Sequence, residues 1–174
     1  EKRIPKTRNE NEIYYSVFYY DYDAIGNLIK EKRSKEYVTE TEKPTFCHEF
    51  YYTYNVMNQL TKATDTTGAC VEYFYDKRGN CISENQKIND TKYKITKYQY
   101  DKANRLIKQT EIIEKQDCYC AEEQMKSVTS YSYDPNGNVI QTIYPNGKKV
   151  LQEYDHSDRL IKTTTLENGK KKRE

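Results

Sequence analysis

Tyrosine and aliphatic residues alternate with polar residues over short stretches of this chain, and each stretch runs into a cluster of Asp, Asn and Gly. The clearest stretch is residues 20–28, which read Tyr-Asp-Tyr-Asp-Ala-Ile-Gly-Asn-Leu. Residues two apart lie on one face of a strand, so alternation followed by turn residues predicts a β-hairpin. The same nine positions recur at 52–60, 73–81, 98–106, 131–139 and, with Gln152 in place of the first tyrosine, 152–160. We number these copies one to six.

The incoming strand of each hairpin is defined by two tyrosines, at positions one and three of the copy. Position three is tyrosine in all six copies, and position one is tyrosine in five of them. Their spacing places both rings on one face of the strand. The residues are Tyr20 and Tyr22, Tyr52 and Tyr54, Tyr73 and Tyr75, Tyr98 and Tyr100, Tyr131 and Tyr133, and Tyr154.

Positions four and seven predict one turn geometry. Asp and Asn favour the start of a type I turn, and Gly, Asn and Asp best tolerate a positive φ. A type I turn closed by a left-handed residue is a common hairpin connection. Position four holds Asp23, Asn55, Asp76, Asp101, Asp134 and Asp155, and position seven holds Gly26, Asn58, Gly79, Asn104, Gly137 and Asp158.

Position nine begins the return strand, and in this hairpin it lies opposite position three. The residues there are Leu28, Leu60, Cys81, Leu106, Val139 and Leu160. We therefore expect six aromatic–aliphatic cross-strand pairs, each adding roughly 0.2–1 kcal/mol over a pair of small residues. They are Tyr22 with Leu28, Tyr54 with Leu60, Tyr75 with Cys81, Tyr100 with Leu106, Tyr133 with Val139, and Tyr154 with Leu160.

Between the copies, the chain predicts further turns and two longer excursions. Residues 65–68 and 144–147 read as second turns ending in Gly68 and Gly147. Residues 31–43 are highly charged and are expected to face solvent, with a strand resuming at 45–54. Residues 111–127 form either extended strands with a long tip or a short helix over 121–126. Residues 1–12 are expected to be a frayed lead-in or the end of an earlier repeat, and residues 13–174 the repeat array.

Six tandem copies of Tyr-x-Tyr-Asp-x-x-Gly-Asn-Leu resemble the YD or RHS repeat. That family includes bacterial Rhs-type polymorphic toxins, wall-associated surface proteins, insecticidal toxin-complex subunits and animal teneurins. The resemblance implies an all-β fold of tandem antiparallel β-hairpins in a curved sheet, a sector of a YD-repeat shell. It also implies a secreted or cell-surface protein, with neighbouring YD repeats and an enclosed or C-terminal domain of the same polypeptide as partners. Spacing alone equally permits a flat meander or a small barrel.

Composition excludes some classes of function but does not identify one. Leu, Ile, Val and Phe make up about 17% of the 174 residues, while there are 19 tyrosines and the net charge is +2. Tyrosine buries a large ring and keeps a polar tip, so it replaces part of the missing aliphatic core. The near-neutral charge argues against a nucleic-acid partner. No apolar run approaches the ~18 residues of a membrane span, and the chain reads as a piece of a longer polypeptide.

Candidate chemistry is sparse, and we expect no catalytic, cofactor or metal site. His48 and His156 lie in unrelated contexts, and one carboxylate per turn does not supply the six to eight oxygens that Ca²⁺ takes. Cys47, Cys70, Cys81, Cys118 and Cys120 lack the spacing of a zinc site. The resemblance to YD/RHS repeats, taken with this sparse chemistry, implies a non-enzymatic structural segment of a shell that encloses or presents a toxin or another domain. The alternative is a module that binds carbohydrate or a cell surface through its tyrosine-rich sheet.

Overall fold

The computed structural model describes residues 2–9, 12–34, 38–39, 41, 43–115, 126–167 and 170–171. The chain divides into two compact units. The first comprises residues 1–73 and 86–89, and the second comprises residues 74–85 and 90–174. Copies one and two of the repeat lie in the first unit, and copies four to six lie in the second. Copy three begins at Tyr73 and lies otherwise in the second unit.

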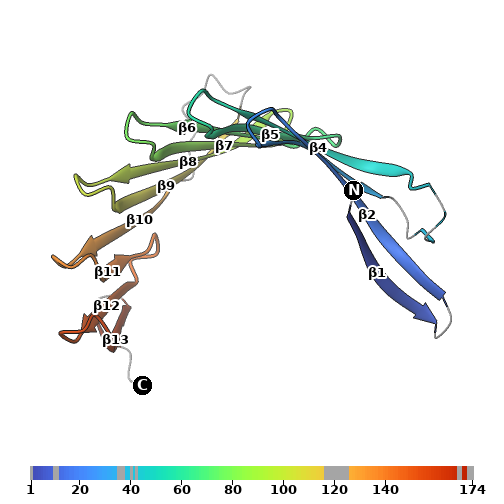
Figure 1. Cartoon of the computed structure of the whole chain (residues 1–174). Helices are drawn as coiled ribbons and strands as arrows, with labels where there is room; N and C mark the ends of the chain where they lie inside the picture. The colour runs from blue at the N-terminus through green and yellow to red at the C-terminus, as the bar shows by residue number, and fades with distance from the viewer. Residues whose placement is uncertain are drawn as a thin grey trace. The chain divides into compact units, whose positions relative to one another are not determined.

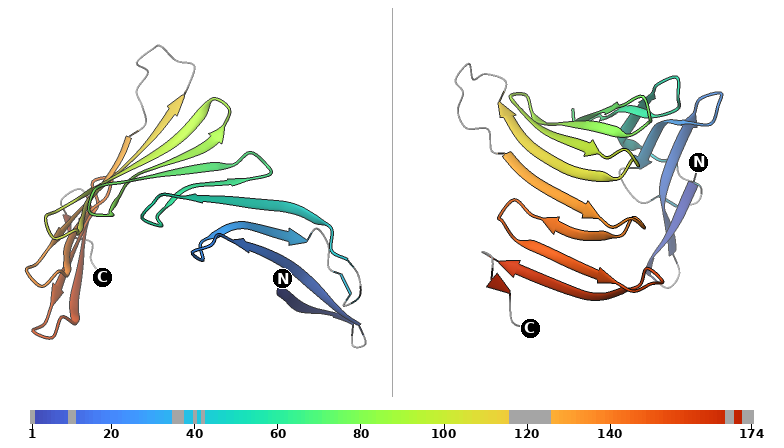
Figure 2. Two further views of the ribbon diagram at one scale, coloured as in Figure 1. Left: turned by 45° about the horizontal axis from the view of Figure 1, so that its top comes forward. Right: turned by 90° about the vertical axis from the view of Figure 1, so that its left-hand side faces the viewer.

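The described residues form fourteen β-strands (Figure 1). They are β1 (Lys2–Asn9), β2 (Glu12–Tyr22), β3 (Leu28–Ser34), β4 (Phe46–Tyr54), β5 (Leu60–Asp65), β6 (Cys70–Tyr75), β7 (Cys81–Asn89), β8 (Lys92–Tyr100), β9 (Leu106–Lys115), β10 (Lys126–Tyr133), β11 (Val139–Ile143), β12 (Lys149–Tyr154), β13 (Leu160–Glu167) and β14 (Lys170–Lys171). In both units each strand lies beside its neighbours in the sequence, and every described pairing is antiparallel (Figure 2). The all-β architecture of tandem antiparallel hairpins is confirmed.

The register within the hairpins is the one that the sequence predicts. Five of the six expected pairs are confirmed by the described registers: Tyr22 with Leu28, Tyr54 with Leu60, Tyr100 with Leu106, Tyr133 with Val139, and Tyr154 with Leu160. The sixth pair, Tyr75 with Cys81, stays a prediction. In each of the five hairpins with a confirmed pair the register shifts next to the pair, so position ten is an extra residue on the return strand. Such a β-bulge leaves two residues opposite one and increases the local twist. The bulge residues are Ile29, Thr61, Ile107, Ile140 and Ile161.

Of the two alternatives for residues 1–12, a frayed lead-in does not describe residues 2–9, which form β1, while the end of an earlier repeat stays a prediction. This strand pairs with β2 from Lys2 opposite Phe18 to Asn9 opposite Glu12. Pro5 has no amide hydrogen to donate and is tolerated because β1 is an edge strand with one described neighbour. Because β1 consists mostly of charged and polar residues, the hydrophobicity pattern does not predict this strand. Its backbone pairs the edge of β2 that would otherwise be open.

The expected solvent-facing excursion at 31–43 is corrected at Val38. This residue forms an isolated antiparallel bridge with Tyr15, through backbone hydrogen bonds of 2.8 and 3.0 Å, and is buried. Strand β3 leaves β2 beyond Arg33, and Val38 pairs with the stretch of β2 that β3 does not reach. Apolar burial is the physical reason, because Val17, two residues away in β2, is fully buried.

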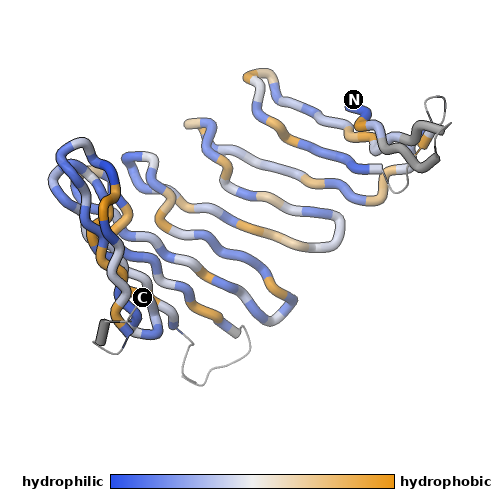
Figure 3. Tube along the Cα trace, turned by 90° about the horizontal axis from the view of Figure 1, so that it is seen from below, coloured by the Kyte–Doolittle hydropathy of each residue, from blue (hydrophilic) through white to orange (hydrophobic). Residues whose placement is uncertain are grey.

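The buried core of the described residues is very small. Its hydrophobic members are Val17, Val38 and Ile112, and Thr96, Thr110 and Thr142 are buried polar residues. Apolar residues lie in short stretches along the strands, separated by polar residues (Figure 3). The second excursion continues as strand to Lys115 and resumes at Lys126, as the extended alternative predicts. The helix expected over 121–126 lies outside the described residues except for Lys126, which begins β10.

Candidate functional site: the hairpin turns and the joints between copies

The six turns share one geometry. The amide of position four donates to the carbonyl of position eight at 2.9–3.0 Å, and the amide of position seven donates back to the carbonyl of position four at 3.0–3.2 Å. Position seven has a positive φ in every copy: 92° at Gly26, 59° at Asn58, 89° at Gly79, 60° at Asn104, 99° at Gly137 and 59° at Asp158. The predicted left-handed residue is confirmed in all six turns.

The side chain at position four caps its own turn. In copy four, Asp101 Oδ1 accepts hydrogen bonds from the amides of Ala103 at 2.8 Å and Arg105 at 3.0 Å. The Arg105 Nε donates to the other carboxylate oxygen at 2.7 Å. The amide of position eight bonds position four in all six copies. Hydrogen bonds to the charged form favour it, so the pKa of Asp101 lies below its usual value, chiefly because of the Arg105 amide.

Tyrosine at position three does more than fill a cross-strand pair. Its hydroxyl donates to the backbone carbonyl of position nine in the preceding copy, on the neighbouring hairpin. The described bonds of this kind are Tyr54 to Leu28 at 2.8 Å, Tyr100 to Cys81 at 2.9 Å, Tyr133 to Leu106 at 2.6 Å, and Tyr154 to Val139 at 3.2 Å. We call each contact between successive copies a joint. The spacing of the tyrosines predicts that the rings share one face of the strand, but it does not reveal the joint.

The joints also share a strand register. Position eleven of one copy lies opposite the residue immediately before the next copy in four joints. The pairs are Lys30 with Tyr51, Lys62 with Glu72, Lys108 with Ser130, and Gln141 with Leu151. Each return strand therefore presents the same stretch of backbone to the hairpin that follows it.

Positions seven and eight alternate between two types along the chain. Copies one, three and five carry Gly-Asn, whereas copies two, four and six carry Asn-Gln, Asn-Arg and Asp-Arg. The asparagine at position eight of an odd copy donates to the side chain at position seven of the next copy. These bonds join Asn27 to Asn58 at 3.4 Å, Asn80 to Asn104 at 3.1 Å, and Asn138 to Asp158 at 2.7 Å.

The joint from copy four to copy five uses arginine instead. Arg105 Nη1 donates to the carbonyl oxygen of Asp134 at 3.0 Å, and its guanidinium lies 4.8 Å from the centre of the Tyr133 ring. A hydrogen bond and a cation–π contact thus replace the asparagine bond of the odd copies. The alternation is visible in the sequence, where it could have predicted two kinds of joint.

Shallow grooves lie at two of the joints in the second unit. One of about 430 Å³ includes Ile82, Tyr100 and Asn104, and one of about 560 Å³ includes Ile140, Tyr154 and Asp158. These residues occupy the same positions in the joints from copy three to four and from copy five to six. Both grooves open on bulge residues of the return strands and bases of the turns. They offer polar and apolar contacts to an extended ligand, without a deep enclosure.

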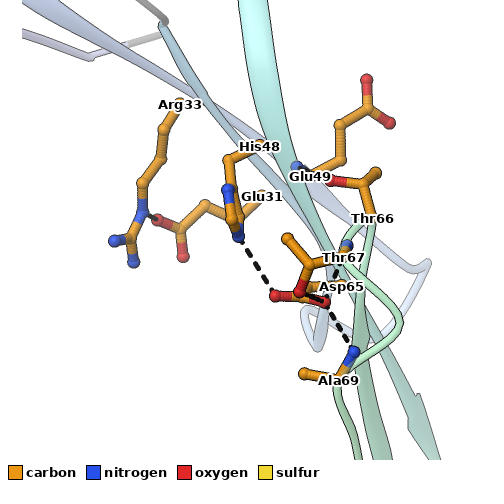
Figure 4. Close-up of polar contacts among 8 residues, drawn as sticks. All are labelled: Glu31, Arg33, His48, Glu49, Asp65, Thr66, Thr67 and Ala69. Carbon is orange, nitrogen blue, oxygen red and sulfur yellow. Dashed lines mark hydrogen bonds and ion pairs between the residues drawn. The ribbon is translucent and has the colours of Figure 1, made fainter.

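A separate polar cluster surrounds Asp65 in the second turn of the first unit (Figure 4). His48 Nε2 lies 3.1 Å from Asp65 Oδ2, while Asp65 Oδ1 accepts from the Thr67 hydroxyl at 2.6 Å and the Ala69 amide at 2.9 Å. The Thr67 hydroxyl, followed by His48 and the backbone amides, lowers the pKa of Asp65 to about 2. The bonds from Thr67 and Ala69 to Asp65 are those of a capped turn.

The described residues include no group of three or more His, Cys, Asp or Glu side chains that could hold a metal ion. Cys47, Cys70 and Cys81 are free thiols, and Cys118 and Cys120 lie outside the described residues. Burial raises the pKa of the Cys81 thiol, as for a small apolar residue at position nine. Among the described residues there is no helix long and apolar enough to cross a membrane.

Fold and joints together define a class of protein, a tandem array of antiparallel β-hairpin repeats. Residues 133–171, which span most of copies five and six, match the family model of the RHS repeat. The resemblance to YD/RHS repeats is confirmed by this match, and the same turn geometry occurs in all six copies. A comparison with curated proteins finds no match.

Several solved structures are similar to this chain at low identity. The crystal structure of TcdB2-TccC3-TEV has 16% identity and a TM-score of 0.43, over 88% of this chain and 9% of that chain. That of TcdB2-TccC3 has 13% identity and a TM-score of 0.42, over 93% and 11%. The Photorhabdus luminescens Tc holotoxin pore has 11% identity and a TM-score of 0.38, over 92% and 12%. The chain spans about a tenth of the length of these structures.

Proposed function

We propose that this chain is a non-enzymatic structural segment of an RHS-type shell in a larger secreted or surface protein. The shell encloses or presents a toxin or another domain of the same polypeptide. The observation that carries the proposal is the repeated joint, in which a tyrosine hydroxyl of one hairpin bonds the backbone of the hairpin before it. A wall built from repeats extends by forming the same contact at each joint. Tyrosine at position three, which makes this contact, is present in all six copies.

The distribution of side chains supports a wall more than a reaction centre. The turn carboxylates accept hydrogen bonds from their own turns, as Asp76 does from Asn80 and Asp155 does from Arg159. These bonds lower the pKa of both aspartates, led in each case by the side-chain bond from position eight. General acid–base catalysis needs groups whose pKa lies near the working pH. Carboxylates with lowered pKa stabilise turns instead.

Protection of the enclosed domain tests this function. The whole polypeptide that carries this segment is digested with trypsin beside its enclosed domain expressed alone. We expect the domain to survive within the polypeptide under conditions that cleave it when it is alone. A variant with Tyr54, Tyr100, Tyr133 and Tyr154 changed to Phe should lose that protection, while Tyr22→Phe, which spares the joints, should keep it. Equal cleavage of the domain in both settings would refute an enclosing role.

Carbohydrate binding is the second candidate, favoured by tyrosine rings that stay open to solvent. Tyr22 is 59% exposed, and Tyr51 and Tyr144 are each 40% exposed. Exposed aromatic faces stack on apolar ligand surfaces. A glycan array with the whole chain tests this candidate. Selective binding that Tyr51→Ala or Tyr144→Ala removes, with the fold intact by circular dichroism, would favour it over the shell.

A further inference from the structure

The turn between β11 and β12 carries an asparagine–glycine pair that the proposed function does not use. Asn146 and Gly147 are both exposed there. Asparagine is chemically labile, and a following glycine leaves its side-chain amide open to attack by the next backbone nitrogen. The chain has two further pairs of this kind. One is Asn136-Gly137 in the turn of copy five, and the other, at 168–169, lies outside the described residues.

The two described pairs have closely matched surroundings along the backbone. Each asparagine follows a proline, and each glycine has a positive φ, 78° at Gly147 and 99° at Gly137. The amide of Gly147 donates to the Tyr144 carbonyl at 2.9 Å, and that of Gly137 donates to the Asp134 carbonyl at 3.2 Å. In both turns this bond must open before the glycine nitrogen can react. The backbone therefore does not distinguish the two asparagines.

The side-chain contacts do distinguish them. Asn146 Oδ1 accepts a hydrogen bond from the Lys148 amide at 3.0 Å. A donor in this place polarises the side-chain carbonyl and stabilises the negative charge that its oxygen develops when the carbon is attacked. Asn136 Nδ2 instead donates to Asp158 Oδ1 at 2.9 Å. That bond to a charged group must break before the side-chain nitrogen can leave.

The two asparagines also differ in what a new carboxylate would meet. At Asn146 it would lie in a shallow, open groove of about 510 Å³ that Lys148 also lines, so it would lie near a cation. At Asn136 it would replace a donor to Asp158 and set two like charges against each other, which disfavours the charged product. Both comparisons favour reaction at Asn146.

We propose that Asn146 is a site of non-enzymatic deamidation and that the bond to Asp158 protects Asn136. The Gly147 nitrogen loses its proton to water and attacks Asn146 Cγ, so that a C–N bond forms. The Cγ–Nδ2 bond breaks, and ammonia leaves with a proton regained from water. A second water molecule then adds to either carbonyl of the resulting imide ring and opens it, leaving aspartate or isoaspartate. Nothing is oxidised or reduced.

The isoaspartate product changes the connection between two strands. Its main chain contains one additional methylene, whereas the turn joins strands that pair from Ile143 opposite Lys149. A longer connection disturbs this register, because the turn sets the register of a hairpin. We therefore expect faster amide hydrogen exchange at residues 141–143 in the converted chain. The site rests on one turn and goes beyond the shell role proposed above.

Incubation of the whole chain at mildly alkaline pH tests the site, with peptide mass spectrometry to follow each asparagine. We expect Asn146 to convert about tenfold faster than Asn136, because only Asn136 must first break a bond to a charged group. Asp158→Gly removes that acceptor and places glycine at position seven, as in the odd copies. This variant should raise the rate at Asn136 several-fold and leave the rate at Asn146 unchanged.

Three results would overturn the proposal. One is conversion of Asn136 as fast as that of Asn146 in the folded parent chain. Another is the same ratio of the two rates in the folded chain and in urea, because the local sequence alone would then determine it. The third is an unchanged rate at Asn136 in Asp158→Gly, with the circular dichroism of the parent. None of these results bears on protease protection of the enclosed domain, so the two proposals fail separately.

Discussion

Position seven of each copy shows how one residue determines a turn. Its φ is positive in all six copies, where an L-residue with a Cβ is strained by roughly 1–2 kcal/mol unless its side chain compensates. Glycine avoids the strain at Gly26, Gly79 and Gly137. Asn58, Asn104 and Asp158 adopt φ near 60° and accept side-chain hydrogen bonds from the preceding copy. In the even copies, a hydrogen bond across the joint therefore offsets the backbone strain that a residue with a Cβ has at this φ.

Substitution of Gly137 isolates the backbone contribution. A Cβ added there would have no heavy atom within 4 Å, apart from its chain neighbours, and φ is 99°. Gly137→Ala should therefore lower the free energy of unfolding by about 1–2 kcal/mol through backbone strain alone. Gly137→Asn, which tolerates this region better, should lower it by less. Urea denaturation measures both, and equal stability of the alanine variant and the parent would contradict the turn geometry.

The turn carboxylates predict the direction of the acid response. Asp65 has a pKa of about 2 in the folded chain, led by the Thr67 hydroxyl bond, against an ordinary value of 3.8. The unfolded chain takes up the proton first, so stability should fall as the pH drops from about 4 to about 2. Asp76, Asp101 and Asp155 also have lowered pKa values and shift stability in the same direction.

The urea midpoint at pH 5, 3 and 2 tests this acid response. Asp65→Asn keeps an acceptor oxygen without the titration and should flatten part of the decline. A midpoint that stays constant over this range in the parent chain would show that the carboxylates are not held in their charged form.

At the scale of the hairpin, two kinds of joint are described. Odd copies reach forward with asparagine, and copy four reaches forward with Arg105. Both kinds of side chain bond the aspartate of their own turn and also reach the neighbouring hairpin, as Asn80 and Arg105 do. A hairpin of this size is marginal alone, so such contacts decide whether it is populated.

Arg105 and Arg159 form a matched pair for testing the arginine joint. Arg105→Lys keeps the charge but loses the planar group that lies over Tyr133 and donates to Asp134. We expect it to reduce the free energy of unfolding by about 1 kcal/mol. Arg159→Lys alters the same bond to its own turn without a next hairpin among the described residues, and we expect a change of only a few tenths of a kcal/mol. If both variants lost a similar free energy of unfolding, the stabilisation by arginine would come from its own turn and not from the joint.

At the scale of the whole molecule, the described residues contain three buried hydrophobic side chains. We therefore expect contacts between neighbouring hairpins to supply most of the stability. Stability should therefore approach a sum of hairpin and joint contributions, as in other repeat proteins.

The sequence predicts what is local and misses what depends on the neighbouring hairpin. Positions four, seven and nine have chemistry that acts within one hairpin, so the turns and the Tyr100–Leu106 type of pair were predictable. The tyrosine hydroxyl bond depends on which carbonyl the return strand of the preceding copy presents, and no residue type encodes that. The pairing of β1 and the burial of Val38 depend on an open stretch of β2, which becomes visible only when the strands are placed.

The most direct test of the account is the free energy of unfolding of a fourfold variant, with Tyr54, Tyr100, Tyr133 and Tyr154 changed to Phe. The rings stay, and only the four hydroxyl bonds across joints are removed. At about 1 kcal/mol each, the loss should be about 4 kcal/mol, a large part of the 5–15 kcal/mol typical of a domain. Tyr22→Phe, whose hydroxyl makes no joint among the described residues, should leave stability unchanged. A fourfold variant as stable as the parent would contradict the claim that these bonds hold the copies together.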